Sequence, residues 1–118
     1  MITFYDRHGA PIAYSDDLES IYFFSGEPVA YIVGDSIYDF NGNHLGWFTD
    51  GWVRDHNGEA VFFTEISKYG PLKPFKQFKP FKSLKLLKPL KALRELKPLK
   101  PFNSPHWSSL SGDNFFNN

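Results

Sequence analysis

The sequence predicts an all-β fold in which four tandem β-hairpin repeats with pseudo-four-fold symmetry precede an extended tail of the polyproline II type. Two observations predict it. Glycines recur at Gly9, Gly26, Gly42 and Gly58, each inside a run of aromatic and β-branched residues. Within residues 71–102, every third residue is Leu or Phe. We therefore divide the chain into a hairpin domain over residues 1–66, a stem over 67–102 and an aromatic C-terminal segment over 103–118.

Each hairpin unit has strand-forming runs on both sides of its glycine, over residues 3–15, 20–32, 36–48 and 52–64. Aromatic and β-branched residues favour strands. The Asn-Gly pairs at Gly42 and Gly58 are typical of two-residue type I′ turns, which need positive φ at both positions. Ser, Asp and Gly residues also separate the units. We therefore expect an up-and-down antiparallel arrangement of about eight strands, with Gly9, Gly26, Gly42 and Gly58 as the structural turn residues.

Two-residue turns would also fix which residues face each other across each hairpin. On one face, tyrosines would lie opposite aliphatic residues: Tyr5 with Ile12, Tyr22 with Val29, and Tyr38 with Leu45. On the other face, a large residue would lie opposite a small one: Phe4 with Ala13, Ile21 with Ala30, and Ile37 with Gly46. The fourth unit reverses this order, with Val53 opposite Phe62. The recurring small residues suggest that the strands converge at a symmetry axis.

The stem follows a three-residue pattern in which Leu or Phe comes second and, up to residue 100, Lys or Arg comes third. A period of three matches polyproline II and does not match the α-helix. Residues 71–102 would span roughly 100 Å as a rod, against a head with a radius of gyration of about 11 Å. We expect this rod to project, fold back on itself or pack against other chains. A short helix within residues 89–97 is an alternative for that stretch.

Burial of the apolar edge of the stem between chains is the arrangement that the pattern favours, because a solitary exposed row of Leu and Phe is an aggregation hazard. The candidate association residues are Leu72, Phe75, Phe78, Phe81, Leu84, Leu87, Leu90, Leu93, Leu96 and Leu99. The C-terminal segment is too apolar for a solvated terminus. We expect Trp107, Leu110, Phe115 and Phe116 to dock on the head or on a neighbouring chain.

Charge divides the chain into two halves. Residues 1–70 carry three basic and eleven acidic side chains, a net charge of −8, and residues 71–118 carry ten basic and two acidic ones, a net charge of +8. The two halves either attract each other or meet different partners. The chain has no cysteine, no apolar run of membrane-helix length and no signal-peptide pattern at its start, so we expect a cytoplasmic protein.

The hairpin units, best represented by residues 37–51, the period-three tail and the closing Trp107-Ser108-Ser109-Leu110 together resemble a small bacterial family, the 4-fold beta flower domain. The resemblance covers nearly the whole chain. This tail differs from the Pro-Ile-rich tails common in the family because lysine occupies its third positions. The resemblance implies a shallow, flower-shaped β-fold and supplies no catalytic residues.

No catalytic, cofactor-binding or metal-binding residues are predicted, and we expect that the protein is not an enzyme. Asp6, Asp39 and Asp55 occupy equivalent repeat positions and are expected to cap turns; the alternative is a carboxylate ring that holds a hard cation. The histidines at or beside hairpin tips, His8, His44 and His56, are expected to be turn or surface residues, because tips that point apart do not converge on zinc. Nucleophile-elbow, P-loop and dinucleotide-binding motifs are absent from the sequence.

Three functional hypotheses follow. The leading one is a structural or binding module that forms homo-oligomers through the amphipathic stem. The alternative is a module that binds an anionic surface, either membrane or nucleic acid, through the stem lysines. The third, which the residues favour least, is an enzyme or metal protein that uses the Asp positions.

Overall fold

The computed structural model describes residues 1–110 and 112–117 and confirms the all-β hairpin fold. Its eight strands are β1 (Ile2–Tyr5), β2 (Pro11–Ser15), β3 (Ser20–Phe23), β4 (Pro28–Val33), β5 (Ser36–Tyr38), β6 (His44–Thr49), β7 (Trp52–Arg54) and β8 (Ala60–Phe62). Each strand pairs antiparallel with the next one in the chain, in the order β1 to β8. A 3₁₀ helix, η1, covers Gly112–Phe115. The molecule is a disc of 36 × 36 × 22 Å.

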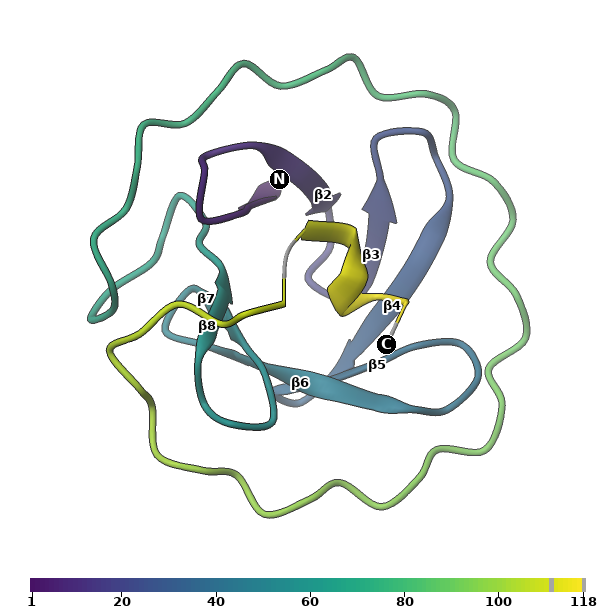
Figure 1. The fold of residues 1–118 in the computed structure, drawn as a ribbon. Coiled ribbons are helices and arrows are strands. Elements are labelled where there is room, and N and C mark those ends of the chain that lie inside the picture. Colours follow the sequence, from purple (N-terminus) through teal and green to yellow (C-terminus); the bar gives the residue numbers. More distant parts are fainter. Residues whose placement is uncertain (111, 118) are drawn as a thin grey trace.

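One bridge joins the two ends of the sheet, which is nearly closed. Residue Phe63, which follows β8, pairs with Tyr5 of β1 through two backbone hydrogen bonds of 2.8 and 2.9 Å. The four hairpins therefore surround one axis, with their tips pointing outward (Figure 1). This bridge, with a second one between Ala60 and Trp107, covers part of the edges that β1 and β8 would otherwise expose to strand-mediated aggregation.

The hairpin turns differ from the two-residue turns that we expected. In the first hairpin, the Gly9 N–H donates to the carbonyl of Asp6, and the Asp6 N–H donates to the carbonyl of Ala10. Gly9 has a φ of +82°, whereas neither Asn41 nor Asn57 has positive φ, so the type I′ prediction is wrong. The pattern instead fits a turn that ends in a left-handed glycine and a bulge. The glycine is the fourth residue of the turn and not the third.

This turn geometry corrects half of the predicted register. The large–small pairs are confirmed: Phe4 with Ala13, Ile21 with Ala30, Ile37 with Gly46, and Val53 with Phe62. The predicted tyrosine pairs are wrong, because a bulge between each large–small pair and the following tyrosine shifts the register by one residue. The observed pairs are Tyr5 with Pro11, Tyr22 with Pro28, and Tyr38 with His44, in place of Ile12, Val29 and Leu45.

The main core consists of the large–small positions. Phe4, Ala13, Ile21, Ala30 and Ile37 are fully buried in one cluster. The tyrosines form a second layer of stacked pairs between neighbouring hairpins, such as Tyr14 with Tyr22 and Tyr31 with Tyr38, both with ring centroids 5.9 Å apart. Each hairpin alone would expose its apolar face, so the four repeats are stable only together.

The tail forms a belt, which we define as residues 71–104, around the head. Figure 1 shows this segment following the circumference of the disc past all four hairpin tips. The belt carries no helix or strand, including the stretch 89–97 where a short helix was the alternative. The expectation that the rod must project, fold back on itself or pack against other chains left out a fourth arrangement. A rod of roughly 100 Å closes into a ring about 32 Å across, which matches the disc.

The C-terminal segment returns from the belt and lies over the centre of one face of the disc (Figure 1). Phe115 is fully buried and Phe116 is 7% exposed, and both pack against the ring of Phe62 with centroids 5.8 and 5.7 Å away. The Trp107 ring lies 5.6 Å from that of Trp52, and Leu110 packs at the edge of the main core. These four predicted docking residues thus contact this chain's own head. No helix among the described residues has the length and apolarity to cross a bilayer.

Candidate functional site

The belt is held to the hairpin tips by a repeated set of backbone hydrogen bonds. The N–H groups of Gln77, Leu86, Glu95 and Ser104 each donate to the carbonyl of a turn glycine, Gly9, Gly26, Gly42 and Gly58 respectively, at 2.9 Å. The belt carbonyls of Phe75, Leu84, Leu93 and Phe102 lie so close to the same glycines that an added Cβ would overlap them. The belt therefore docks every nine residues, one docking point for each hairpin.

Proline placement follows this nine-residue period. All six prolines of the belt occupy first positions of triplets, and three of them, Pro80, Pro89 and Pro98, recur every nine residues, one triplet after the docking donors Gln77, Leu86 and Glu95. Two further first positions, Ser83 and Ala92, donate to the carbonyls of Phe24 and Phe40 at 2.8 and 3.0 Å. Proline has no N–H and prefers the extended conformation, so it stiffens the belt wherever a donor is not needed. The first positions that are not proline are thus the sequence signal for docking.

The belt cations face the head. Lys82 and Lys85 lie over the rings of Tyr14 and Tyr22 at 4.8 and 5.0 Å, and Lys91 lies over Tyr31 at 4.4 Å. Ammonium groups are attracted to aromatic faces, with a typical gain of about 0.5–1 kcal/mol at exposed sites. The two charged halves of the chain therefore attract each other, which was one of the two expectations from the charge distribution.

Acidic residues in the turns between hairpins complete this contact. Lys85 pairs with Asp16 at 2.7 Å and Lys100 with Asp35 at 2.8 Å. The hydrogen bond from Lys85 lowers the pKa of Asp16, and that from Lys100 lowers the pKa of Asp35. These pairs are about 40% exposed, so each contributes little to stability on its own.

The second residue of each triplet points away from the head. We call the eleven side chains at these positions the rim: Leu72, Phe75, Phe78, Phe81, Leu84, Leu87, Leu90, Leu93, Leu96, Leu99 and Phe102. Their exposed fractions lie between 92% and 101%. The rim contains all ten predicted association residues and adds Phe102. The structure leaves these side chains open to solvent around the circumference of the disc.

Arg54 joins the two ends of the belt. Its Nη1 donates to the carbonyls of Gly58 at 2.8 Å and Ser104 at 2.7 Å, and its Nη2 donates to the backbone carbonyl of Tyr69, two residues before the belt, at 3.4 Å. Arg54 takes the place that tyrosine has in the other repeats, and its burial lowers the pKa of its guanidinium. Arg54, the residue that departs from the repeat, therefore links the start of the belt to its end.

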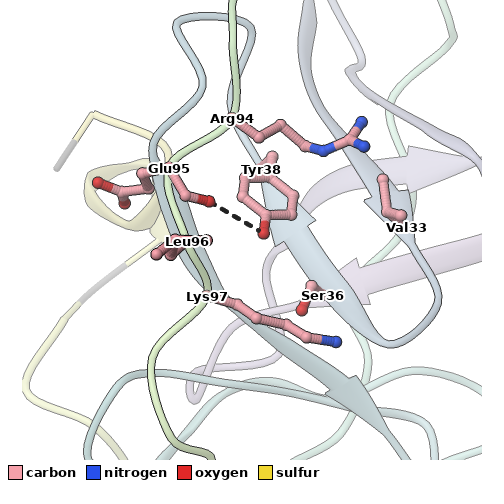
Figure 2. Close-up of a pocket in the computed structure, with 7 residues that line it drawn as sticks. All are labelled: Val33, Ser36, Tyr38, Arg94, Glu95, Leu96 and Lys97. Carbon is pink, nitrogen blue, oxygen red and sulfur yellow. Dashed lines mark hydrogen bonds between the residues drawn. The ribbon is translucent and has the colours of Figure 1, made fainter.

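His44 is the second departure from the repeat. The first two hairpins have Pro11 and Pro28 at this position, whereas the His44 N–H donates to the Glu95 Oε1 at 2.5 Å. Glu95 also lines a cavity of about 330 Å³, but Figure 2 shows its carboxylate directed away from Arg94 and Lys97, which flank the Tyr38 ring. At this position the head has an N–H donor, which proline lacks, and the belt has a carboxylate acceptor for it.

The His44 side chain connects two other side chains. Its Nε2 lies 3.2 Å from the Ser36 Oγ and its Nδ1 lies 3.0 Å from the His56 Nε2. Burial, reinforced by the neighbouring His56, lowers the pKa of His44 to about 4. Serine, histidine and an orienting group form a nucleophilic site only where the histidine is a good base near neutral pH. A pKa near 4 and a Ser36 that is 1% exposed favour a structural role.

The carboxylates at equivalent repeat positions cap their own turns. Asp6 Oδ1 accepts from the His8 and Ala10 N–H groups, both at 2.9 Å, and Asp39 and Asp55 repeat this pattern. Asp55 also accepts from the Ser108 hydroxyl of the C-terminal segment. Within residues 1–110 and 112–117, His, Asp and Glu side chains form no group of three that could hold a metal ion.

Comparison with known proteins agrees with this architecture. The family model of the 4-fold beta flower protein matches residues 2–116. No curated protein and no solved structure matches the chain significantly. The function of this family is not known. With four hairpins around one axis and a match over nearly its whole length, the chain belongs to the 4-fold beta flower family.

Proposed function

We propose that this protein is a non-enzymatic structural module that associates with copies of itself through the rim. The rim carries the proposal. Eleven Leu and Phe side chains, at roughly 150–200 Å² each, amount to about 2,000 Å² of apolar surface. The largest apolar patch on a typical monomer covers about 300–600 Å² and often serves in binding. A cytoplasmic location is part of the same proposal.

The rim is not needed to hold the fold together, which also supports a role in association. Its side chains are at least 92% exposed, whereas the backbone and the cations of the belt make the contacts with the head. Burial of apolar area is favourable by about 25 cal/mol per Å². The exposed rim side chains do not give the fold this stabilisation. Selection for folding alone would therefore not require Leu or Phe at these positions.

Sedimentation velocity of the full chain over a wide concentration range tests the proposal. We expect the wild-type protein to form oligomers, and a variant with all eleven rim residues replaced by serine to remain monomeric. A variant with the same residues replaced by methionine keeps the apolar surface and should still associate. A wild-type protein that stays monomeric throughout, or a serine variant that associates like the wild type, would show that the proposal is wrong.

The alternative function, binding to an anionic membrane or nucleic acid, has less support. Lys82, Lys85, Lys91 and Lys100 lie against tyrosine rings or carboxylates of the head. A polyanion would have to displace these contacts and approach an acidic head. Binding of the full chain to phosphatidylserine vesicles or single-stranded DNA, with a steep decrease as salt increases, would favour this alternative.

A further inference from the structure

We infer that the partner of the rim is a set of several identical copies, arranged side by side in a layer one disc thick. This inference rests on the proposed function and specifies its geometry. The rim follows the circumference of a disc that is 22 Å thick and 36 Å across. Contacts at a circumference place neighbouring molecules beside one another and leave the two faces of the disc free.

The curvature of the rim excludes burial by a single partner. Successive rim residues are three positions apart in an extended chain, a spacing of about 9 Å. Two convex rims that touch bring together only two or three side chains from each copy. Even complete burial of these four to six side chains, at roughly 150–200 Å² each, amounts to roughly 600–1,200 Å² in total, which does not exceed the lower limit of the 1,200–2,000 Å² of a stable interface. One dimer contact is therefore weak and leaves most of the rim exposed, so several neighbours are needed to cover it.

An identical copy fits the rim for a further reason, which is spacing. Side chains about 9 Å apart leave gaps into which the side chains of a second rim with the same spacing can insert. A two-fold axis parallel to the disc axis makes the two belts antiparallel at the contact, as in an isologous interface. Because the spacing is the same all along the belt, this contact can form at several places on each disc.

The belt lysines do not oppose this packing. Lys79, Lys82, Lys85 and Lys100 each lie within 4 Å of a carboxylate on the same chain. Four of the ten cations in residues 71–118 are thus paired with carboxylates, and the acidic head balances the rest, since the whole chain has a formal net charge of zero. We expect the association to depend weakly on salt, which distinguishes it from binding to a polyanion.

Three variants of the full chain test the number of contact sites. Each replaces three rim residues by serine in one arc: Phe75, Phe78 and Phe81; Leu84, Leu87 and Leu90; or Leu93, Leu96 and Leu99. We expect each variant to associate more weakly than the wild type, with all three retaining some association. Electron microscopy of the concentrated wild type should show layers one disc thick.

The outcomes separate the inference from the proposed function. If one arc variant abolishes association while the other two match the wild type, the rim holds a single dimer patch and the inference is wrong, although the proposed function stands. Closed dimers as the largest wild-type species would lead to the same conclusion. If the serine variant of all eleven rim residues associates normally, the proposed function itself is wrong. Circular dichroism spectra should match in all variants, since the rim side chains make no contacts with the head.

Discussion

At the scale of single residues, the turn glycines serve both the hairpin and the belt. Gly42 has a φ of +89°, and an added Cβ would overlap the carbonyl of Leu93. Gly34 has a φ of +62°, but nothing lies within 4 Å of its added Cβ. The two positions share the conformational requirement and differ only in the approach of the belt, so they form a matched pair.

We predict that Gly42→Ala destabilises the protein more than Gly34→Ala. Both substitutions add left-handed strain of about 1–2 kcal/mol. Gly42→Ala must also displace the belt, which should cost about 2 kcal/mol more through lost hydrogen bonds. Urea unfolding at pH 7 measures both free energies of unfolding. Equal losses in the two variants would show that the belt does not press on the glycine.

His44 makes stability depend on pH. Its pKa is about 4 in the folded protein, below the ordinary value of 6.5, so the unfolded chain binds more protons between these values. Stability should therefore fall as the pH falls from 6.5 to 4, by up to about 3 kcal/mol. The groups that act on His44 are His56, Glu95, Lys97 and Asp35.

The second hairpin supplies a control for this prediction. The double variant His44→Pro with Glu95→Leu copies the Pro28 and Leu86 combination and removes the buried imidazole. Its urea unfolding free energy should change less than that of the wild type between pH 7 and pH 4.5. Parallel pH profiles for the two proteins would contradict the role of His44.

At the scale of elements, the belt is attached by its backbone. The Leu86 N–H donates to the Gly26 carbonyl at 2.9 Å. Leu86 is the first residue of its triplet, and Pro89 is the first residue of the next triplet. Proline suits the extended conformation of the belt but lacks the donor. We predict that Leu86→Pro costs about 1–3 kcal/mol because it leaves the Gly26 carbonyl without a partner. Leu86→Ala keeps the N–H and should cost less than half as much in urea unfolding.

Much of the head could be predicted from the sequence because its information is local. Strand-forming runs around Gly9, Gly26, Gly42 and Gly58 predicted four hairpins, and the large–small pairs such as Phe4 with Ala13 were confirmed. The tyrosine register was wrong because an X-Gly pair suits two turn types. Asp6, Asp39 and Asp55 cap the longer turn, but the second hairpin forms the same turn with Phe23 at that position, so the Asp residues alone do not select it.

The path of the belt could not be predicted from the period of three alone. A straight rod and a ring have the same local conformation, and only the match between belt length and disc circumference selects the ring. The nine-residue spacing of Pro80, Pro89 and Pro98 encodes that match, but it becomes readable only with the hairpin tips in place. Arg54 and His44 depart from the repeat, and their partners Ser104 and Glu95 lie 50 and 51 residues further along the chain, so a local pattern could not identify them.

At the scale of the whole molecule, folding and association use different edges of the same chain. The non-proline first residues and several third-position cations of the triplets bind the head, and the second residues form the rim. Sequence changes in the rim can therefore alter the partner without altering the fold. The closed ring of Arg54, Tyr69 and Ser104 keeps the belt in place, so the rim remains circular whichever side chains it carries.

The nine-residue docking interval also limits how such a protein can change in length during evolution. Each hairpin of about sixteen residues needs its own nine residues of belt, although the two segments are far apart in the gene. Loss of one triplet before Leu86 would bring Pro89 and Pro98 to the donor positions of Leu86 and Glu95 and shorten the ring by about 9 Å. A fifth hairpin would therefore require two simultaneous insertions, one in the head and one in the belt. We expect changes in the number of hairpins to be rare, which keeps the diameter of the disc constant.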